Sequence, residues 1–199
     1  MLLHWGGAVG IALIIFVETG VFFGFMFPGD SLLITAGILA ALAAEGKIDL
    51  GMLITLSTFA AIAGDQVNYT LGIRLGKTLV TRYSRFRTYL NRAQVFYDRH
   101  GARTITLARF VPIVRTFAPA IAGAANMHHK SFTEYNVLGG IAWVVSMTLT
   151  GYALGKIPHV KDYLPVVIAL VVLASLVLSY VEWRKIRRQK GVDEKKISP

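Results

Sequence analysis

Three apolar segments, residues 50–73, 133–155 and 163–181, are long enough for an α-helix to cross a bilayer. The hydrocarbon core of a bilayer is roughly 30 Å thick, and a helix rises about 1.5 Å per residue. The chain is also 54% hydrophobic and only 16% charged, with a mean hydropathy of +0.55. This composition is too apolar for an ordinary soluble domain, so the sequence predicts an all-α polytopic membrane protein.

Two further apolar stretches, 9–27 and 31–44, are separated by Pro28 and Gly29. A helix break frees backbone groups that cannot face lipid, so a break at membrane depth must lie inside the protein or against a water-filled cavity. A second proline, Pro112, interrupts the apolar region 103–126 in the same way. We expect each region to form a re-entrant helical hairpin whose tip lies in the protein interior.

The two halves of the chain share the same order of short motifs. Each half has a proline, then an Ala-Gly pair, then a long apolar segment that ends in Leu-Gly-Lys; the members are Pro28, Ala36-Gly37 and Leu75-Gly76-Lys77, then Pro112, Ala122-Gly123 and Leu154-Gly155-Lys156. The offsets are 84, 86 and 79 residues. This near-constant spacing indicates an internal duplication, with repeat one at about 9–77 and repeat two at about 103–156.

Basic residues indicate how the repeats are oriented. Of 21 Lys and Arg residues, eight lie in 74–103 and seven follow Trp183, and both runs flank apolar spans. Cytoplasmic loops carry such an excess, so both runs are predicted to be cytoplasmic. The two hairpins would then enter from opposite sides of the membrane, as an inverted repeat. This placement also argues against nucleic acid as the partner of a chain with a net charge of +10.

We therefore expect a single membrane domain over 1–183, with a last transmembrane helix at 163–181 and a basic cytoplasmic tail at 184–199. Segment 82–100 mixes Arg with Tyr, Phe and Leu at near-helical spacing. It is predicted to be an interfacial amphipathic helix, and a plain solvated loop is the alternative.

Two acids lie in or next to the first apolar stretches. An acidic side chain near the centre of a membrane helix costs roughly 2.5–3.5 kcal/mol, so Glu18 is expected to face a cavity or a partner. The alternatives are a structural ion pair or a helix end at the interface. Asp30 follows Gly29 and precedes an apolar helix, a position typical of an N-cap, and an N-cap at a buried tip remains a titratable acid.

Arg109 and Arg115 lie on either side of Pro112. A guanidinium stays charged and offers a planar fork of donors that suits phosphate or carboxylate oxygens, so two of them at one hairpin tip form a candidate anion clamp. Two alternatives remain: the arginines pair only with Glu18 and Asp30, or they extend to the cytoplasmic surface.

Asp65, Tyr69, Gly72 and Gly76 share one helical face. Gly72 with Gly76, and likewise Gly151 with Gly155, are pairs of small residues that let helices approach closely, so helix packing is the favoured role of this face. Asp65 would bond to Tyr69 or to a neighbouring helix. The sequence has no cysteine and no hydrolase, metalloprotease or Walker motif, so we expect no metal, no cofactor and no enzymatic activity.

The sequence resembles the DedA family of bacterial inner-membrane proteins, which belongs to the wider VTT-domain group. The resemblance covers about residues 9–156 and rests on the following residues: Glu18; Phe27-Pro-Gly-Asp30 with Ala36-Gly37; Gly64-Asp65, Tyr69, Gly72 and Gly76; Arg109-Phe110, Pro112 and Arg115; Ala122-Gly123 and Met127; and Phe132, Asn136, Gly139-Gly140 and Trp143.

The resemblance implies two opposed re-entrant hairpins and a transporter that moves a lipid phosphate carrier, such as undecaprenyl phosphate, across the bacterial cytoplasmic membrane. Proton motive force would drive it, with Arg109 and Arg115 binding the phosphate and Glu18 and Asp30 coupling protons. We place five further residues in support: Pro28, Gly29, Asp65, Tyr69 and Pro112. Two alternatives stay open, a passive phospholipid scramblase and an intramembrane lipid-phosphate enzyme, and the glycine faces leave association of two copies open.

Overall fold

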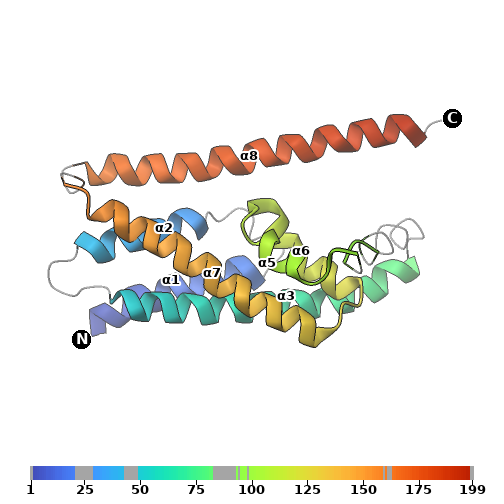
Figure 1. Ribbon diagram of the computed structural model, residues 1–199, viewed down its shortest axis with the longest axis horizontal. Helices are drawn as coiled ribbons and strands as arrows, with labels where there is room; N and C mark the ends of the chain where they lie inside the picture. Colours follow the sequence, from blue (N-terminus) through green and yellow to red (C-terminus); the bar gives the residue numbers. More distant parts are fainter. Residues whose placement is uncertain are drawn as a thin grey trace.

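The computed structural model describes residues 2–20, 29–42, 49–82, 93, 95–97, 99–158, 160 and 163–197. Within these residues the chain is helical and contains no strand, as predicted. The helices are α1 (Leu2–Gly20), α2 (Gly29–Leu42), α3 (Leu50–Arg82), α5 (Arg103–Ala108), α6 (Pro112–Ala124), α7 (His129–Gly155) and α8 (Leu164–Ile197), labelled in Figure 1.

Two helices in the described part of the chain are long and apolar enough to cross a membrane, Leu50–Gly76 in α3 and His129–Gly155 in α7. They contain the predicted crossings 50–73 and 133–155. Shorter apolar stretches are Gly7–Gly20, Gly29–Leu42 and Leu164–Val177. The predicted span 163–181 lies in α8, which continues without a break into the basic segment that follows it.

Several sequence predictions lie wholly or partly outside the described residues. Pro28 is one of them, so the structure bears on the first hairpin tip only from Gly29 onward. Most of the predicted interfacial helix 82–100 is another, because residues 83–92, 94 and 98 are not described. Pro112 is described and begins α6 at its first turn, where proline is well tolerated because the first N–H groups of a helix have no intrahelical acceptor.

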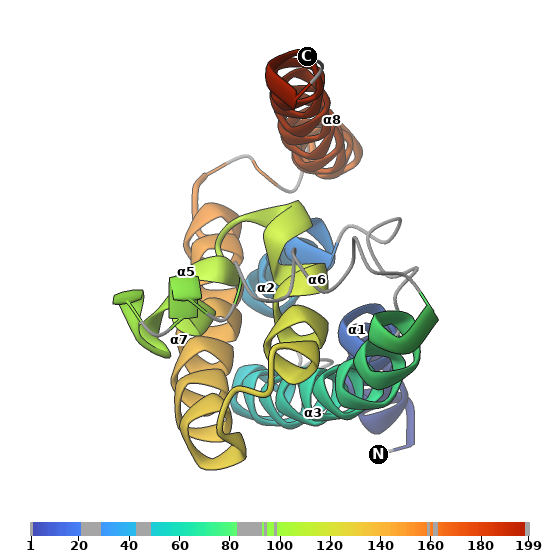
Figure 2. The same ribbon diagram turned by 90° about the vertical axis from the view of Figure 1, so that its right-hand side faces the viewer.

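Helices α2 and α6 each pack along a long helix from the other half of the chain. Helix α2 lies along α7, α6 lies along α3, and α1 also packs on α3. Figure 1 shows α8 running along one side of the molecule, and Figure 2 shows it at the edge of the group formed by the other helices. It packs against α2 and α6. The packing therefore joins residues distant in sequence.

Glycines make these two interfaces close. A Cβ on Gly37 of α2 would overlap the backbone of Thr148 on α7. A Cβ on Gly123 of α6 would overlap the backbone of Tyr69 on α3. The two glycines are 86 residues apart and their partners 79 apart, which are the offsets found between the halves of the sequence.

The facing glycines repeat this correspondence. Gly72 of α3 abuts the backbone of Ala120, and Gly151 of α7 abuts the backbone of Ile34. Here too the glycines differ by 79 positions and their partners by 86. The α2–α7 and α6–α3 interfaces thus use equivalent residues, and the predicted packing role of the glycine face is confirmed.

A small apolar core lies where α1, α2, α3 and α7 meet. Its buried members are Ile15, Leu33, Ala61, Trp143 and Val144. Large apolar side chains also lie on the outside, with Phe59 69% exposed and Leu107 66% exposed. An outer surface of this kind suits a chain surrounded by lipid.

Candidate functional site

Three charged side chains from three helices meet in the interior. Glu18 lies near the end of α1, Asp30 in the first turn of α2, and Arg115 in the first turn of α6. The Nη1 atom of Arg115 lies 2.6 Å from Oδ1 of Asp30, and its Nη2 atom lies 2.6 Å from Oε1 of Glu18. The single guanidinium thus holds two carboxylates.

Burial makes this cluster unusual. The side chains of Glu18, Arg115 and Asp30 are only 3%, 10% and 19% exposed, respectively. Buried charges are retained where they are paired and hydrogen-bonded, as these are. Arg115 therefore does not extend to the cytoplasmic surface, one of the alternatives that the sequence left open.

Trp143 of α7 completes the cluster. Its indole Nε1 donates a hydrogen bond of 2.7 Å to Oδ1 of Asp30, and the guanidinium of Arg115 lies 4.7 Å from the centre of the ring. Sequence reasoning did not assign Trp143 to the site, because an aromatic residue in an apolar helix has the appearance of core. The only available signal was that a buried indole N–H needs an acceptor.

Gly29 begins α2 beside the carboxylate of Glu18. Its backbone N–H donates to Oε1 of Glu18 at 3.2 Å, and a Cβ at this position would overlap the carboxylate. The first turn of a helix also carries a partial positive charge that favours an anion. Gly29 is thus required by the close approach of α1 to the tip.

Asp30 does not occupy the N-cap position that the sequence favoured. Helix α2 begins at Gly29, so Asp30 lies within the first turn. Its carboxylate instead accepts from side chains of α6 and α7, the guanidinium of Arg115 and the indole N–H of Trp143.

Arg109 forms a second, separate ion pair. It follows α5 and bonds through Nη2 to Asp65 of α3, to Oδ1 of Asn136 at 2.5 Å and to the backbone oxygen of Ala61 at 3.4 Å. The side chains of Arg109 and Asp65 are each 5% exposed. The two arginines predicted to act together therefore have different partners: Arg115 contacts Glu18 and Asp30, and Arg109 contacts Asp65.

Asp65 and Tyr69 share a helical face but bond to different partners. The hydroxyl of Tyr69 donates to the backbone oxygen of Met127 at 2.5 Å, and its ring stacks on Phe132 with centroids 4.3 Å apart. Tyr69 therefore fixes the junction between α6 and α7, whereas Asp65 pairs with Arg109 in the interior.

A polar bridge links the two helix ends beside the site. Nδ2 of Asn68 on α3 donates to the backbone oxygens of Thr19 at 3.1 Å and Thr116 at 2.9 Å. The bridge fixes the end of α1 relative to the start of α6, and so fixes Glu18 relative to Arg115. Sequence reasoning missed Asn68, whose only signal is an amide within an apolar segment.

A cavity of about 10 Å³ lies between the two ion pairs. Its lining consists of Glu18, Thr19, Asp65, Arg109, Arg115, Thr116 and Trp143. This volume holds about one water molecule and is too small for a phosphate group. The structure is therefore a closed arrangement, and a larger anion requires the helices around Arg115 to separate.

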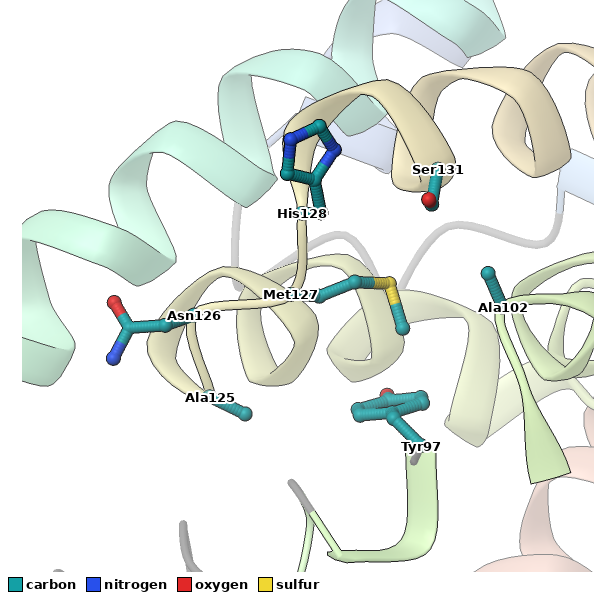
Figure 3. Close-up of a pocket in the computed structure, with 7 residues that line it drawn as sticks. All are labelled: Tyr97, Ala102, Ala125, Asn126, Met127, His128 and Ser131. Atoms are coloured by element: carbon teal, nitrogen blue, oxygen red, sulfur yellow. The ribbon is translucent and has the colours of Figure 1, made fainter. Parts of the chain in front are cut away.

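A second cavity, of about 220 Å³, lies at the turn between α6 and α7. Figure 3 shows the ring of Tyr97 beside the side chain of Met127, while the side chain of Asn126 points away from them. This turn has Asn126 at a positive φ of 55°, which asparagine tolerates better than most residues. Within the described residues, no group of three or more His, Cys, Asp or Glu side chains could hold a metal ion.

Comparisons with known proteins place the chain in a family. The VTT domain model matches residues 27–153. "Protein DedA" of Escherichia coli strain K12 is 43% identical over 173 residues, covering 85% of this chain and 78% of that protein. An uncharacterized membrane protein of Mycobacterium tuberculosis is 39% identical over 191 residues, covering 94% and 83%. "Inner membrane protein YghB" of Escherichia coli is 35% identical over 167 residues, covering 82% and 75%. No solved structure matches the chain.

Proposed function

The chain belongs to the DedA family of membrane proteins, which carry the VTT domain, and on that premise we propose that it translocates a lipid phosphate across the bacterial cytoplasmic membrane. The substrate class is an isoprenyl phosphate of the undecaprenyl phosphate type. The protein moves the lipid without altering it, so it acts as a transporter and not as an enzyme.

The observation that carries this proposal is the position of Arg115 between two buried carboxylates. The guanidinium binds both Glu18 and Asp30 at 2.6 Å in the interior of the protein. A phosphate group offers the same kind of charged oxygen acceptor as these carboxylates, with more oxygens. A phosphate head can therefore replace a carboxylate on Arg115, while the isoprenyl tail stays in lipid.

The fold that we propose for this task is an inverted repeat of two re-entrant hairpins. Its support is the equivalence of the glycine contacts, Gly37 with Thr148 and Gly123 with Tyr69. In transporters built this way, binding sites lie near the bilayer midplane where the broken helices meet. We place the basic 184–199 segment and the C-terminus in the cytoplasm.

Protons provide the coupling in this proposal. Protonation of Glu18 or Asp30 removes one of the two charges that hold Arg115, and protonation of Asp30 favours separation of α2 from α6. A substrate and a proton can drive alternate states only if each has a different affinity for those states. The phosphate favours the arrangement in which Arg115 is free of a carboxylate. A proton bound to Glu18 or Asp30 favours the same arrangement, because it weakens the contact between that carboxylate and Arg115.

The test is transport by the purified full chain in phosphatidylcholine vesicles that contain farnesyl phosphate. A phosphatase added outside cleaves only lipid that reaches the outer leaflet, so translocation increases the fraction cleaved beyond the initial outer pool. We expect Arg115→Ala to abolish this increase and Arg74→Ala, which alters an exposed arginine of α3, to preserve it. Undiminished transport by Arg115→Ala would reject the role of Arg115.

Two further results separate the competing functions. A rate that ignores an imposed pH gradient, together with equal movement of neutral and zwitterionic lipids, would indicate a passive scramblase. Phosphate released without added phosphatase would indicate an enzyme. Intact farnesyl phosphate and a rate that changes with the gradient support the transporter.

A further inference from the structure

We propose that Trp143 is an anion-binding residue, whose indole N–H and the guanidinium of Arg115 together receive the phosphate of the substrate. In the closed arrangement the carboxylate of Asp30 occupies this position as an internal substitute for the ligand. The inference deepens the proposed function and rests on it, because it names the donor that accompanies Arg115.

The geometry around Asp30 carries the argument. A single atom, Oδ1, accepts from Nη1 of Arg115 at 2.6 Å and from Nε1 of Trp143 at 2.7 Å. The guanidinium lies over the same indole ring, 4.7 Å from its centre. The ring thus holds the guanidinium by a cation–π contact and points its own N–H at the oxygen that the guanidinium binds.

Trp143 is well placed to keep this geometry when Asp30 leaves. The residue is 1% exposed and belongs to the buried core with Ile15, Leu33 and Val144. Asp30 is in contrast 19% exposed and sits in the first turn of the shorter helix α2. The indole donor is therefore held by the core, and Asp30 is the more accessible partner.

Chemistry restricts what can replace the carboxylate. An indole N–H and a guanidinium are donors only, so the incoming group must be an acceptor and cannot be a cation. A buried donor left without a partner carries an uncompensated desolvation cost, so Asp30 leaves readily only if another oxygen takes its place. Among the described residues, Asp30 is the one acceptor recorded for Nε1 of Trp143. A phosphate oxygen of the substrate meets this need.

The alternative is that Trp143 and Asp30 form a structural bond with no role in binding. Trp143→Phe by itself does not separate the two ideas, because the N–H has an acceptor in both the closed and the bound arrangement. Removal of Asp30 does separate them. In an Asp30→Ala background the structural bond is already lost, so a further effect of Trp143→Phe reports on the ligand.

The experiment measures binding of farnesyl phosphate to the purified full chain by calorimetry. We expect Asp30→Ala/Trp143→Phe to bind at least roughly tenfold more weakly than Asp30→Ala, because a hydrogen bond to a charged group contributes about 1.5–3 kcal/mol. Equal affinities would overturn the role of Trp143. Farnesol and inorganic phosphate are the matched probes, and we expect both to bind more weakly; inorganic phosphate binding as tightly as farnesyl phosphate would overturn the assignment to a lipid headgroup.

A second measurement does not depend on the stability of the Asp30 variants. The chain has three tryptophans, so Trp5→Phe/Trp183→Phe leaves the indole N–H of Trp143 as a single nitrogen-15 NMR signal. We expect this signal to shift and saturate with farnesyl phosphate and to stay in place with farnesol. Binding of farnesyl phosphate without a shift would overturn this inference and leave the proposed function standing, whereas no binding by the wild-type chain would overturn both.

Discussion

Asp65→Ala should be among the most destabilising single substitutions in the charged interior. Asp65 forms an ion pair with Arg109, and the two side chains are each 5% exposed. The substitution leaves a permanently charged guanidinium in the interior, and among the described residues its remaining acceptors are the oxygens of Asn136 and Ala61. Arg109 cannot lose its proton to escape this cost.

The expected magnitude follows from the burial of the pair. Removal of one partner from a buried ion pair costs about 3–5 kcal/mol, because the remaining charge is uncompensated. Replacement of both partners by apolar residues of similar size is often neutral or stabilising. We therefore expect Asp65→Ala to lower the free energy of unfolding by about 3–5 kcal/mol, and Asp65→Leu/Arg109→Met to recover most of that loss.

The measurement is reversible unfolding in mixed dodecylmaltoside and SDS micelles, followed by tryptophan fluorescence. Asp49→Ala is the matched control, since Asp49 is an exposed aspartate whose Oδ1 accepts from the N–H of Met52 at the start of α3. Loss of such a cap costs about 1 kcal/mol. A cost for Asp65→Ala no larger than that of the control, or a double variant less stable than either single one, would refute the reasoning.

Three further predictions follow from the packing. Gly37→Ala and Gly123→Ala should each lower the free energy of unfolding by about 1–3 kcal/mol, because a Cβ overlaps the facing backbone, whereas Gly7→Ala, with open space around it, should not; the same unfolding assay compares them. Asn68→Leu should cost about 1–3 kcal/mol and lower the transport rate, since it removes the bridge between the ends of α1 and α6. Burial raises the pKa of Tyr97, which lies outside the apolar helices, from 10.0 to about 12. The contribution of Tyr97 to stability is therefore present below pH 10 and lost as the pH rises towards 12. Tyr97→Phe should lessen that loss in unfolding curves across this range.

Hydropathy was sufficient to predict the helical class and two long apolar helices. The apolar segments 50–73 and 133–155 lie in α3 and α7, because length and apolarity are local properties of the chain. The meeting of Glu18 and Asp30 with Arg115 could also be predicted, since buried opposite charges in a lipid-embedded chain have few stable alternatives to pairing.

The choice of partners could not be predicted in the same way. Arg109 and Arg115 are six positions apart and chemically identical, yet only Arg115 reaches Glu18 and Asp30. The difference depends on the turn between α5 and α6, which directs Arg109 towards α3, and on the rotation of α3, which presents Asp65. Helix rotation is a tertiary property that a single sequence does not encode in any local pattern.

The arrangement of contacts suggests how the site opens while the fold persists. The bond between Trp143 and Asp30 lies within the α2–α7 pair, and the bond between Glu18 and Arg115 joins α1 and α6, both of which pack on α3. The bond between Arg115 and Asp30 crosses between these two groups of helices, as do the bond from Gly29 to Glu18 and the packing of α3 on α7. Close contacts between glycines and the facing backbone hold the helices of each group together. Arg115, in contrast, can exchange one oxygen acceptor for another at little cost. Under the proposed function, a phosphate between Arg115 and Trp143 therefore bridges the two groups as Asp30 does now, and movement between them can change access to the phosphate without disturbing the packing within either group.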